Sequence, residues 1–172
     1  MTKLTIIGTS LNPNSKSQQL AQLFQQQVET SSIACQRFDL RELNIPFSGP
    51  DENWATPDLE PIKQAVEQSS HIIFSVPIYC YDVNAAAKNI IELMGRSFTN
   101  KVIGFICSAG GSSSYMSVMG FANHLMLAFR SVICPRFLYV TPQDWDEQGE
   151  LDTDIKERMS LLLEDLKSIQ IN

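Results

Sequence analysis

Residues 8–17 read Gly-Thr-Ser-Leu-Asn-Pro-Asn-Ser-Lys-Ser and join two segments of different periodicity. Before them, Leu4–Gly8 is a short run of residues that favour β-structure, which predicts a strand. After them, apolar residues recur at helical spacing, at Leu20, Leu23, Phe24 and Val28. The chain therefore opens with a strand, a loop rich in hydroxyl side chains and an amphipathic helix.

The rest of the chain alternates between the same two patterns. Apolar runs predict four more strands, at Ile33–Leu40, His71–Val76, Val102–Cys107 and Phe137–Val140. Helical spacing predicts one helix that begins at Thr56-Pro57-Asp58. It predicts three more at Val83–Gly95, Met116–Phe129 and Ile155–Ile169. Strands that alternate with helices indicate parallel βαβ units. We therefore expect one α/β domain over residues 1–172, with a flavodoxin-like, doubly wound sheet of five parallel strands in the order 2-1-3-4-5 and helices on both faces.

Composition excludes several classes of partner. The chain has 172 residues and a formal net charge of −6, without a dense run of Lys or Arg, so we expect neither a nucleic-acid partner nor a membrane surface. No segment approaches the roughly 18 apolar residues of a membrane span, and the first residues carry no signal-peptide pattern. The four cysteines are widely spaced, which predicts reduced thiols in a cytoplasmic protein.

The loop after the first strand is a candidate phosphate site. The order 2-1-3-4-5 puts the topological switch point between strands 1 and 3, where ligands of such sheets bind. Hydroxyl groups and the free N–H groups of a helix N-terminus suit a phosphate dianion. The loop has neither the GxxxxGK[ST] nor the GxGxxG pattern of nucleotide-binding loops. We expect Ser10, Asn12, Ser15 and Ser17 to bind a phosphate; the alternative is an ordinary loop whose serine caps the helix.

Two further loops are expected at the same edge of the sheet. Pro77-Ile78-Tyr79-Cys80-Tyr81-Asp82 follows the third strand, and its two aromatic rings could line a flat ligand, while Asp82 could cap the next helix. Ala109-Gly110-Gly111-Ser112 follows the fourth strand, and its glycines let the backbone approach a ligand. Each loop alone also fits an ordinary turn. Because strands 1, 3 and 4 end side by side in the expected order, the three loops together predict one ligand crevice.

Other reactive residue types do not form a recognisable site. His71 begins a strand and His124 lies within a helix, so a structural role is favoured for both, and the scattered cysteines complete no metal site. A small apolar packing role is favoured for Cys80. The chain has no GxSxG pattern of an esterase. We therefore expect no metal and assign no catalytic side chain.

From about residue 3 to residue 140 the chain resembles the NADPH-dependent FMN reductase family, which includes quinone and azo-compound reductases. The first loop of that family reads Gly-Ser-x-Arg-x-x-Ser-x-Asn. Residues 9–17 align with it without a gap: Ser10 and Ser15 match, Asn12 replaces the arginine and Ser17 replaces the last asparagine.

The second motif of the family is Pro-Glu-Tyr-Asn-Gly-Ser-x-Pro-Gly-x-Leu-Lys-Asn. Pro77–Asn89 has the same length. It keeps Pro77, Tyr79, Lys88 and Asn89 and departs at Ile78, Cys80, Tyr81 and Asn84. Gly110-Gly111 matches the glycine pair of the family. The departures fall at flavin-contacting positions, so they concern affinity and substrate more than fold.

The resemblance implies a function and a cofactor. FMN would bind with its phosphate at the first loop and its ring between residues 77–82 and residues 109–112. NADPH would be the reductant, and a flavin or quinone-like molecule the acceptor, since the cofactor carries out the chemistry. The resemblance also implies a homodimer, as does the helix Met116–Phe129, which is apolar on most sides. The alternatives are a flavodoxin-like electron carrier, although its usual Thr-Gly-x-Thr-Gly loop is absent, and a flavin-binding protein without turnover.

Overall fold

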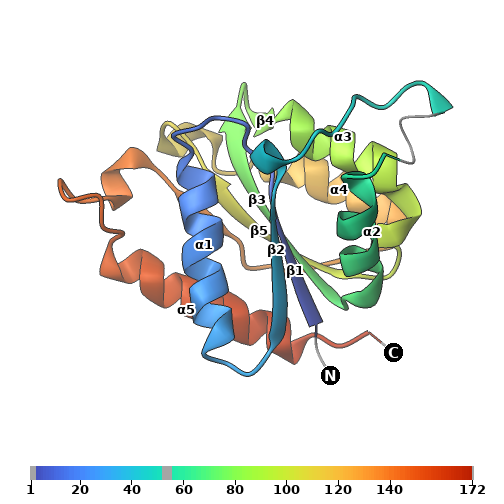
Figure 1. Cartoon of the computed structure of the whole chain (residues 1–172). Helices are drawn as coiled ribbons and strands as arrows, with labels where there is room; N and C mark the ends of the chain where they lie inside the picture. The colour runs from blue at the N-terminus through green and yellow to red at the C-terminus, as the bar shows by residue number, and fades with distance from the viewer. Residues whose placement is uncertain (1–2, 52–55, 172) are drawn as a thin grey trace.

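The computed structural model describes residues 3–51 and 56–171, and its elements alternate between strands and helices (Figure 1). The strands are β1 (Lys3–Gly8), β2 (Ala34–Asp39), β3 (His71–Tyr79), β4 (Asp82–Val83), β5 (Val102–Ser108), β6 (Val132–Ile133) and β7 (Leu138–Val140). The α-helices are α1 (Lys16–Glu29), α2 (Leu59–Gln68), α3 (Ala85–Met94), α4 (Val118–Phe129) and α5 (Thr153–Ser168). Short 3₁₀ helices are η1 (Leu40–Glu42), η3 (Gly95–Phe98), η4 (Ser112–Ser114) and η5 (Pro142–Asp144).

The sheet confirms the predicted strand order. Strands β2, β1, β3 and β5 are parallel neighbours in that sequence, and both β6 and β7 pair with β5 on its outer side. The fifth position of the predicted order is therefore shared by two short strands. Pro135 lies between them and has no N–H to donate, so the ladder is interrupted there.

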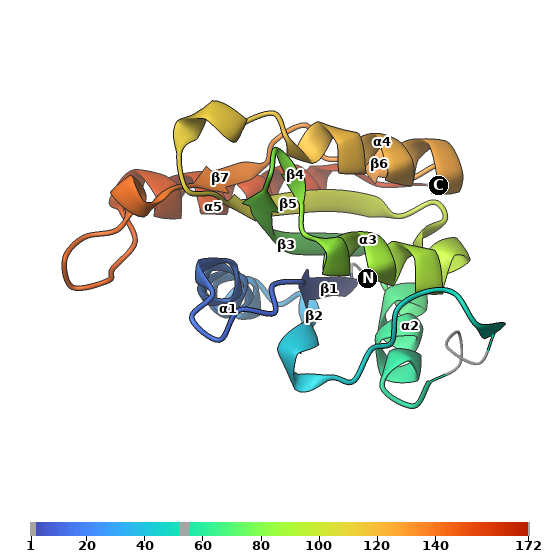
Figure 2. The same cartoon turned by 90° about the horizontal axis from the view of Figure 1, so that it is seen from above.

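Helices cover both faces of the sheet (Figures 1 and 2). Helices α1 and α5 pack on one face, and α2, α3 and α4 pack on the other. Phe74, Phe105 and Phe121 are central to the core under α2, α3 and α4, and Phe24 and Leu162 to the opposite core. The first eight of the nine residues of β3 are buried, as a central strand covered on both faces requires.

The strand register brings the predicted loops to one edge of the sheet. Gly8, the last residue of β1, lies opposite Asp39 of β2 and Ser75 of β3. Pro77 of β3 lies opposite Ser108, the last residue of β5. The loops after these strands therefore leave the sheet side by side, at the upper end of Figure 1, away from both chain ends.

The segment after β3 differs from the sequence prediction. Strand β3 continues to Tyr79 and turns back into β4, so the helix predicted to begin at Val83 begins later, as α3. The turn residues Cys80 and Tyr81 have φ angles of 52° and 62°. Two consecutive left-handed residues form the two-residue hairpin turn that matches the twist of the flanking strands. The predicted aromatic loop is therefore a β-hairpin.

The roles expected of two acidic residues also change. Asp82 was expected to cap a helix, but it lies in β4 and accepts the N–H of its neighbour Val83 at 2.7 Å. Asp58 was expected within the first turn of a helix, but its carboxylate accepts the N–H of Asn44 at 2.7 Å. Helix α2 consequently begins after it, at Leu59.

Replacement of Tyr81 by glycine is expected to stabilise the protein. A left-handed conformation costs an L-residue roughly 1–2 kcal/mol and costs glycine almost nothing, but glycine loses more entropy on folding. We therefore expect Tyr81→Gly to raise the free energy of unfolding by about 0.5–1 kcal/mol, measured by urea denaturation. Tyr115, a second exposed tyrosine, has ordinary right-handed φ and ψ angles, so Tyr115→Gly should destabilise the protein. A lower urea midpoint for Tyr81→Gly would contradict the turn assignment.

Candidate active site

The first loop is tied to the neighbouring strand and helix by hydrogen bonds. The backbone N–H of Thr9 donates to the carbonyl of Ser75 at 3.0 Å. The Thr9 hydroxyl donates to Asn84 Oδ1 at 2.7 Å, and Asn84 Nδ2 donates back to the Thr9 carbonyl at 2.8 Å. Asn84 is the N-cap residue of α3 but makes no cap bond, because its side chain is used in this way. It therefore holds the first loop against the start of α3, a role that sequence reasoning missed.

The predicted phosphate residues lie at the start of α1. Ser15 is the N-cap residue, and its hydroxyl accepts the N–H of Gln18 at 3.2 Å. The Ser17 hydroxyl is 2.9 Å from that of Ser15. Ser10, Ser15 and Ser17 are all buried, and Asn12 is exposed. The backbone N–H groups of the first helical turn lack intrahelical acceptors, and the helix dipole is positive here. The loop thus combines serine hydroxyls with an anion-attracting helix end.

The hairpin places its predicted residues at two depths. Pro77 and Ile78 are buried in β3. Residues 79–82 are exposed at the tip, where the Tyr79 side chain is 52% and the Tyr81 side chain 68% accessible. Cys80 was expected to pack against apolar neighbours, but it is exposed because it occupies the turn. The hairpin therefore presents two accessible aromatic rings beside the first loop.

The glycine loop leaves open space above its backbone. Neither Gly110 nor Gly111 has a positive φ angle, and a Cβ atom added to either would meet no atom within 4 Å. Tyr139 holds the loop from below: its hydroxyl donates to the Gly111 carbonyl at 2.5 Å and lies 2.7 Å from the Ser114 hydroxyl. Ala109 is buried and Ser112 is exposed. Neither the backbone angle nor a neighbouring atom requires glycine at these positions, and the two glycines leave the space above the loop open.

Lys16 is a charged residue of the site that the sequence reasoning did not single out. Its ammonium group lies 3.9 Å from the centre of the Trp145 ring, a cation–π contact, and 3.2 Å from Gln19 Oε1. A small cavity of about 270 Å³ beside it is lined in part by Ala109 and Thr141. The segment after β7 therefore closes one side of the first loop.

The strand ends supply no obvious nucleophile. Cys107 is buried near the end of β5, and burial raises the pKa of its thiol, so the thiol stays protonated. Within residues 3–51 and 56–171, no three His, Cys, Asp or Glu side chains are placed to hold a metal ion. The described helices are all too short or too polar to cross a membrane. Apart from the exposed thiol of Cys80 in the hairpin turn, the described residues of the site offer positions for a ligand rather than reactive side chains.

The geometry fits a ligand with a phosphate group and a flat ring. The start of α1 offers donors to a phosphate, while the hairpin and the open glycine loop stand where a ring could lie. The residues predicted from the three loops are therefore gathered at one edge, where Ser10, Ser15 and Ser17 are buried.

The sequence profile described as NADPH-dependent FMN reductase matches residues 2–146 of this chain. Among solved structures, an NADH:FMN oxidoreductase superposes with a TM-score of 0.82 at 13% identity, covering 100% of this chain and 92% of the other. A flavoenzyme NAD(P)H:(acceptor) oxidoreductase from Paracoccus denitrificans gives a TM-score of 0.77 at 17% identity, with 97% and 96% covered. An azoreductase from Bacillus anthracis str. Sterne gives 0.61 at 14% identity, with 97% and 98% covered. These structural likenesses establish the shared fold.

Ser15→Asp tests the phosphate assignment without removing the helix cap. Aspartate caps a helix about as well as serine, so α1 should remain intact. Its carboxylate would face the phosphate, and like charges in a partly desolvated site repel strongly. We expect Ser15→Asp to weaken FMN binding by at least about tenfold in a fluorescence titration, whereas the neutral Ser15→Asn should weaken it much less. Equal FMN affinity of the aspartate variant and the unmodified protein would refute the assignment.

Proposed function

The chain belongs to the NADPH-dependent FMN reductase family, a family of flavin-dependent oxidoreductases, and we propose that it binds FMN and passes hydride from NADPH to a flavin or quinone-like acceptor. The observation that carries this proposal is the meeting of three loops at one sheet edge, with a capped helix start beside an open glycine loop. Residues 1–172 would act as one domain. The named oxidoreductases with the same fold support the chemistry class.

The phosphate of FMN would lie at the start of α1. Ser15 and Ser10 would donate hydroxyl hydrogen bonds, and the free N–H groups of Lys16 and Ser17 would add backbone donors. The Ser17 hydroxyl would support that of Ser15. Asn12 would contribute a neutral amide from the exposed side of the loop. This donor set contains no carboxylate and therefore suits a dianion.

The ring of FMN would lie between the β3–β4 hairpin, residues 77–82, and the glycine loop, residues 109–112. When bound, FMN supplies the hydride chemistry, and the chain supplies position and access. Gly110 and Gly111 leave one side of that space open. Tyr115, the first aromatic residue after them, packs its ring on Phe137 and Tyr139, with ring centres 5.0 and 5.3 Å apart. An open ring face favours a reductase over an electron carrier, because nicotinamide and acceptor must both approach the ring closely.

The thiols fit a reducing compartment. The four cysteines, Cys35, Cys80, Cys107 and Cys134, are all free in the structure. Burial raises the pKa of Cys35 to about 12, so that thiol resists oxidation at neutral pH. Free thiols persist in the cytosol, which supports a cytoplasmic location.

We expect FMN-loaded protein to oxidise NADPH when a quinone or free FMN is added. The open face allows the two reactants to reach the ring in turn, so turnover should exceed that of free flavin at the same concentration. Nicotinamide absorbance followed with several acceptors measures it, and NADH run in parallel measures the preference for reductant. Ser15→Asp prepared in the same way is the matched control and should show little more than the free-flavin rate. Flavin binding without turnover for any acceptor would favour the non-catalytic alternative.

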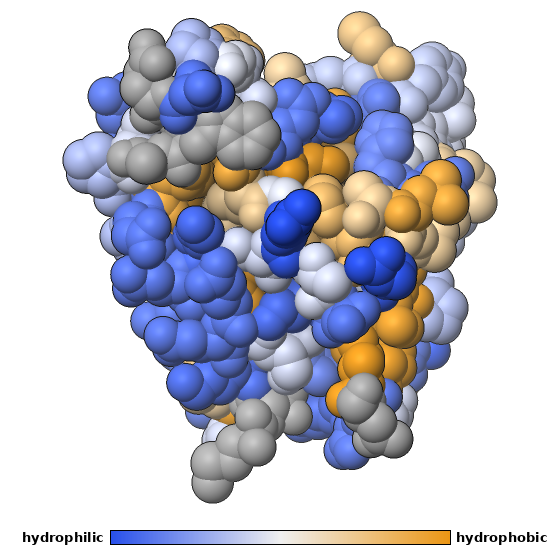
Figure 3. All heavy atoms as spheres, turned by 90° about the vertical axis from the view of Figure 1, so that its right-hand side faces the viewer, coloured by the Kyte–Doolittle hydropathy of each residue, from blue (hydrophilic) through white to orange (hydrophobic). Residues whose placement is uncertain are grey.

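We also propose that the protein works as a homodimer. Helix α4 is strongly apolar, and two of its apolar side chains face solvent: Leu127 is 84% exposed and Met126 37% exposed. A groove of about 970 Å³ runs beside Leu127 and is lined by Ile91, Met94 and Phe129 together with charged side chains such as Lys88 and Glu92. Figure 3 views the molecule from this side and shows hydrophobic residues gathered among polar ones. Exposed apolar patches of this kind commonly mark interfaces, and a second copy would cover this one.

Light scattering at micromolar concentration should give twice the mass of the chain. Leu127→Glu should shift the protein to a monomer, because a carboxylate buried in an apolar interface is costly. Leu161 of α5 is also exposed but lies on the opposite face, so Leu161→Glu should leave the dimer intact. A monomeric mass for the unmodified protein would refute the dimer.

A further inference from the structure

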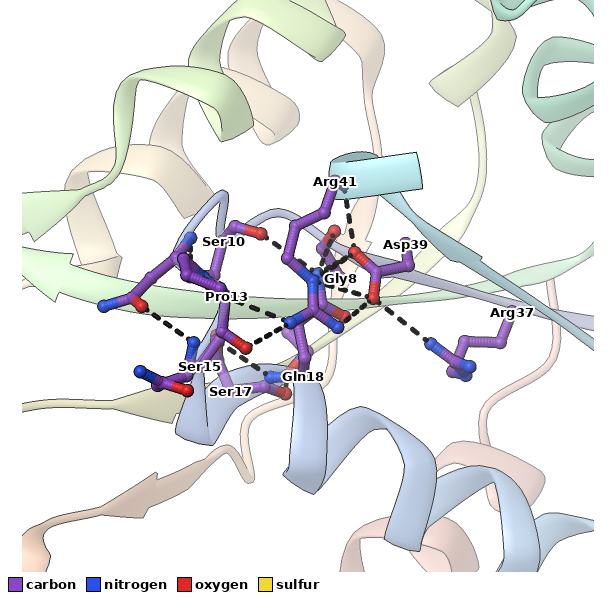
Figure 4. A network of polar contacts seen from close by, with 12 residues as sticks. Gly8, Ser10, Pro13, Ser15, Ser17, Gln18, Arg37, Asp39 and Arg41 are labelled. Atoms are coloured by element: carbon purple, nitrogen blue, oxygen red, sulfur yellow. Dashed lines mark hydrogen bonds and ion pairs between the residues drawn. The ribbon is translucent and has the colours of Figure 1, made fainter. Parts of the chain in front are cut away.

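A buried carboxylate at the end of β2 organises the loop after β1 (Figure 4). Asp39 is 4% exposed and accepts a hydrogen bond from the Gln18 side-chain amide at 2.8 Å. The Nε–H of Arg41 donates to the same carboxylate at 3.0 Å, and Arg41 Nη2 donates to Asp39 Oδ2. A buried carboxylate must be paired, so Asp39 fixes the position of both partners.

Gln18 and Arg41 donate their remaining hydrogen bonds to the phosphate loop. Gln18 Nε2 also lies within hydrogen-bond distance of the carbonyls of Gly8, at 2.9 Å, and Ser10, at 3.2 Å. Arg41 Nη1 donates to the carbonyl of Pro13 at 2.9 Å, with the carbonyl of Asn12 at 3.4 Å. Four carbonyls between residues 8 and 13 therefore contact the two side chains that also bind Asp39, as Figure 4 shows for the labelled residues.

The direction of these carbonyls determines the direction of the loop amides. In a trans peptide the C=O and the following N–H point in opposite directions. The N–H of Leu11 follows the Ser10 carbonyl, which lies near Gln18, so this N–H points away from Gln18. The N–H of Asn14 follows the Pro13 carbonyl held by Arg41 and donates to Asn12 Oδ1 at 2.9 Å. The network thus sets the direction of the Leu11 N–H and supports the turn in which the Asn12 side chain is held.

The close packing of Gln18 shows how tightly the arrangement is fitted. A Cβ atom on Gly8 would lie 2.0 Å from Gln18 Oε1, so only glycine leaves room for the amide. That oxygen has no hydrogen-bond partner in the described part of the chain. This orientation leaves one polar atom unsatisfied, and it is kept because the amide nitrogen bridges Asp39 to the loop.

We propose that Arg41, held by Asp39 and Gln18, is a positioning residue for the phosphate of the flavin. The inference rests on the proposed binding of FMN. Asn12 brings no charge to the loop, and Arg41 braces the same segment from outside through the carbonyls of Asn12 and Pro13. Arg41 acts through the shape of the loop rather than by contact with the phosphate.

Geometry, and not net charge, is the source of this effect. Arg41 forms a charge pair with Asp39, and the two charges largely cancel at a distance. The hydrogen bond to Asp39 raises the pKa of Arg41 further above its ordinary high value, so the pair persists at physiological pH. The planar guanidinium has five donors in a rigid fork and meets both carboxylate oxygens of Asp39 and two loop carbonyls, four acceptors in all, whereas a lysine ammonium has only three donors.

The test compares FMN with riboflavin, which lacks the phosphate, in fluorescence titrations of the full chain. Arg41→Gln should weaken FMN binding by about tenfold and change riboflavin binding by less than about twofold. Arg41→Lys keeps the charge but should remain at least about fivefold weaker for FMN. Arg37→Gln is the matched control, since Arg37 also lies near Asp39, at 3.9 Å, but its Nε donates to Gln25 of α1. It should leave both affinities within about twofold.

Four outcomes would overturn the inference. An equal loss of FMN and riboflavin affinity would mean that Arg41 supports the fold in general. Unmodified FMN affinity in Arg41→Lys, or an FMN loss in Arg37→Gln as large as that in Arg41→Gln, would mean that charge alone matters. Failure of the unmodified protein to bind FMN would instead refute the proposed function itself, and with it the role of Arg41. The riboflavin affinity and the thermal unfolding midpoint of each variant show whether it is folded.

Discussion

The parallel pairing of β1 with β2 on one side and β3 on the other is the constraint on which the rest of the structure depends. Parallel neighbours require crossovers, and crossovers of this kind are right-handed. The chain leaves β1 through α1 on one face and returns through α2 on the other, so the two crossovers diverge at the end of β1. A crevice opens at such a point, and the first loop occupies it.

That position also leaves backbone groups that must find partners. The loop after β1 has no strand or helix of its own, and its polar groups lie against a sheet edge. Asn84 satisfies Thr9 from the side of α3, and the Gln18–Asp39–Arg41 network satisfies four carbonyls from the side of β2. These contacts hold the loop against the sheet edge. In the proposed function the same loop would bind the phosphate, so the contacts that stabilise it would also shape the site.

In the hairpin after β3, the local preference of the residues disfavours the conformation that the fold imposes. A two-residue turn of this shape favours Asn-Gly, the pair at these positions in the family motif, but this chain has Cys80-Tyr81 in left-handed conformations. The pairing of β4 with β3 and the burial of Ile78 hold the turn in place. The result is an accessible tyrosine ring where the family motif has glycine.

The sequence by itself determined the class of fold, the strand order and the three loops that meet at the candidate site. These follow from local patterns: strand-length apolar runs, helical spacing, and hydroxyl or glycine residues at strand ends. Tertiary structure alone decided how the loops are held, because the partners lie far apart, 75 residues for Thr9 and Asn84 and 21 for Gln18 and Asp39. It also decided that residues 78–83 form a hairpin, since Cys-Tyr carries no turn signal and cross-strand pairing overrides local preference. Periodicity reports which residues face the core, whereas hydrogen bonds between distant segments depend on where the folded sheet brings them.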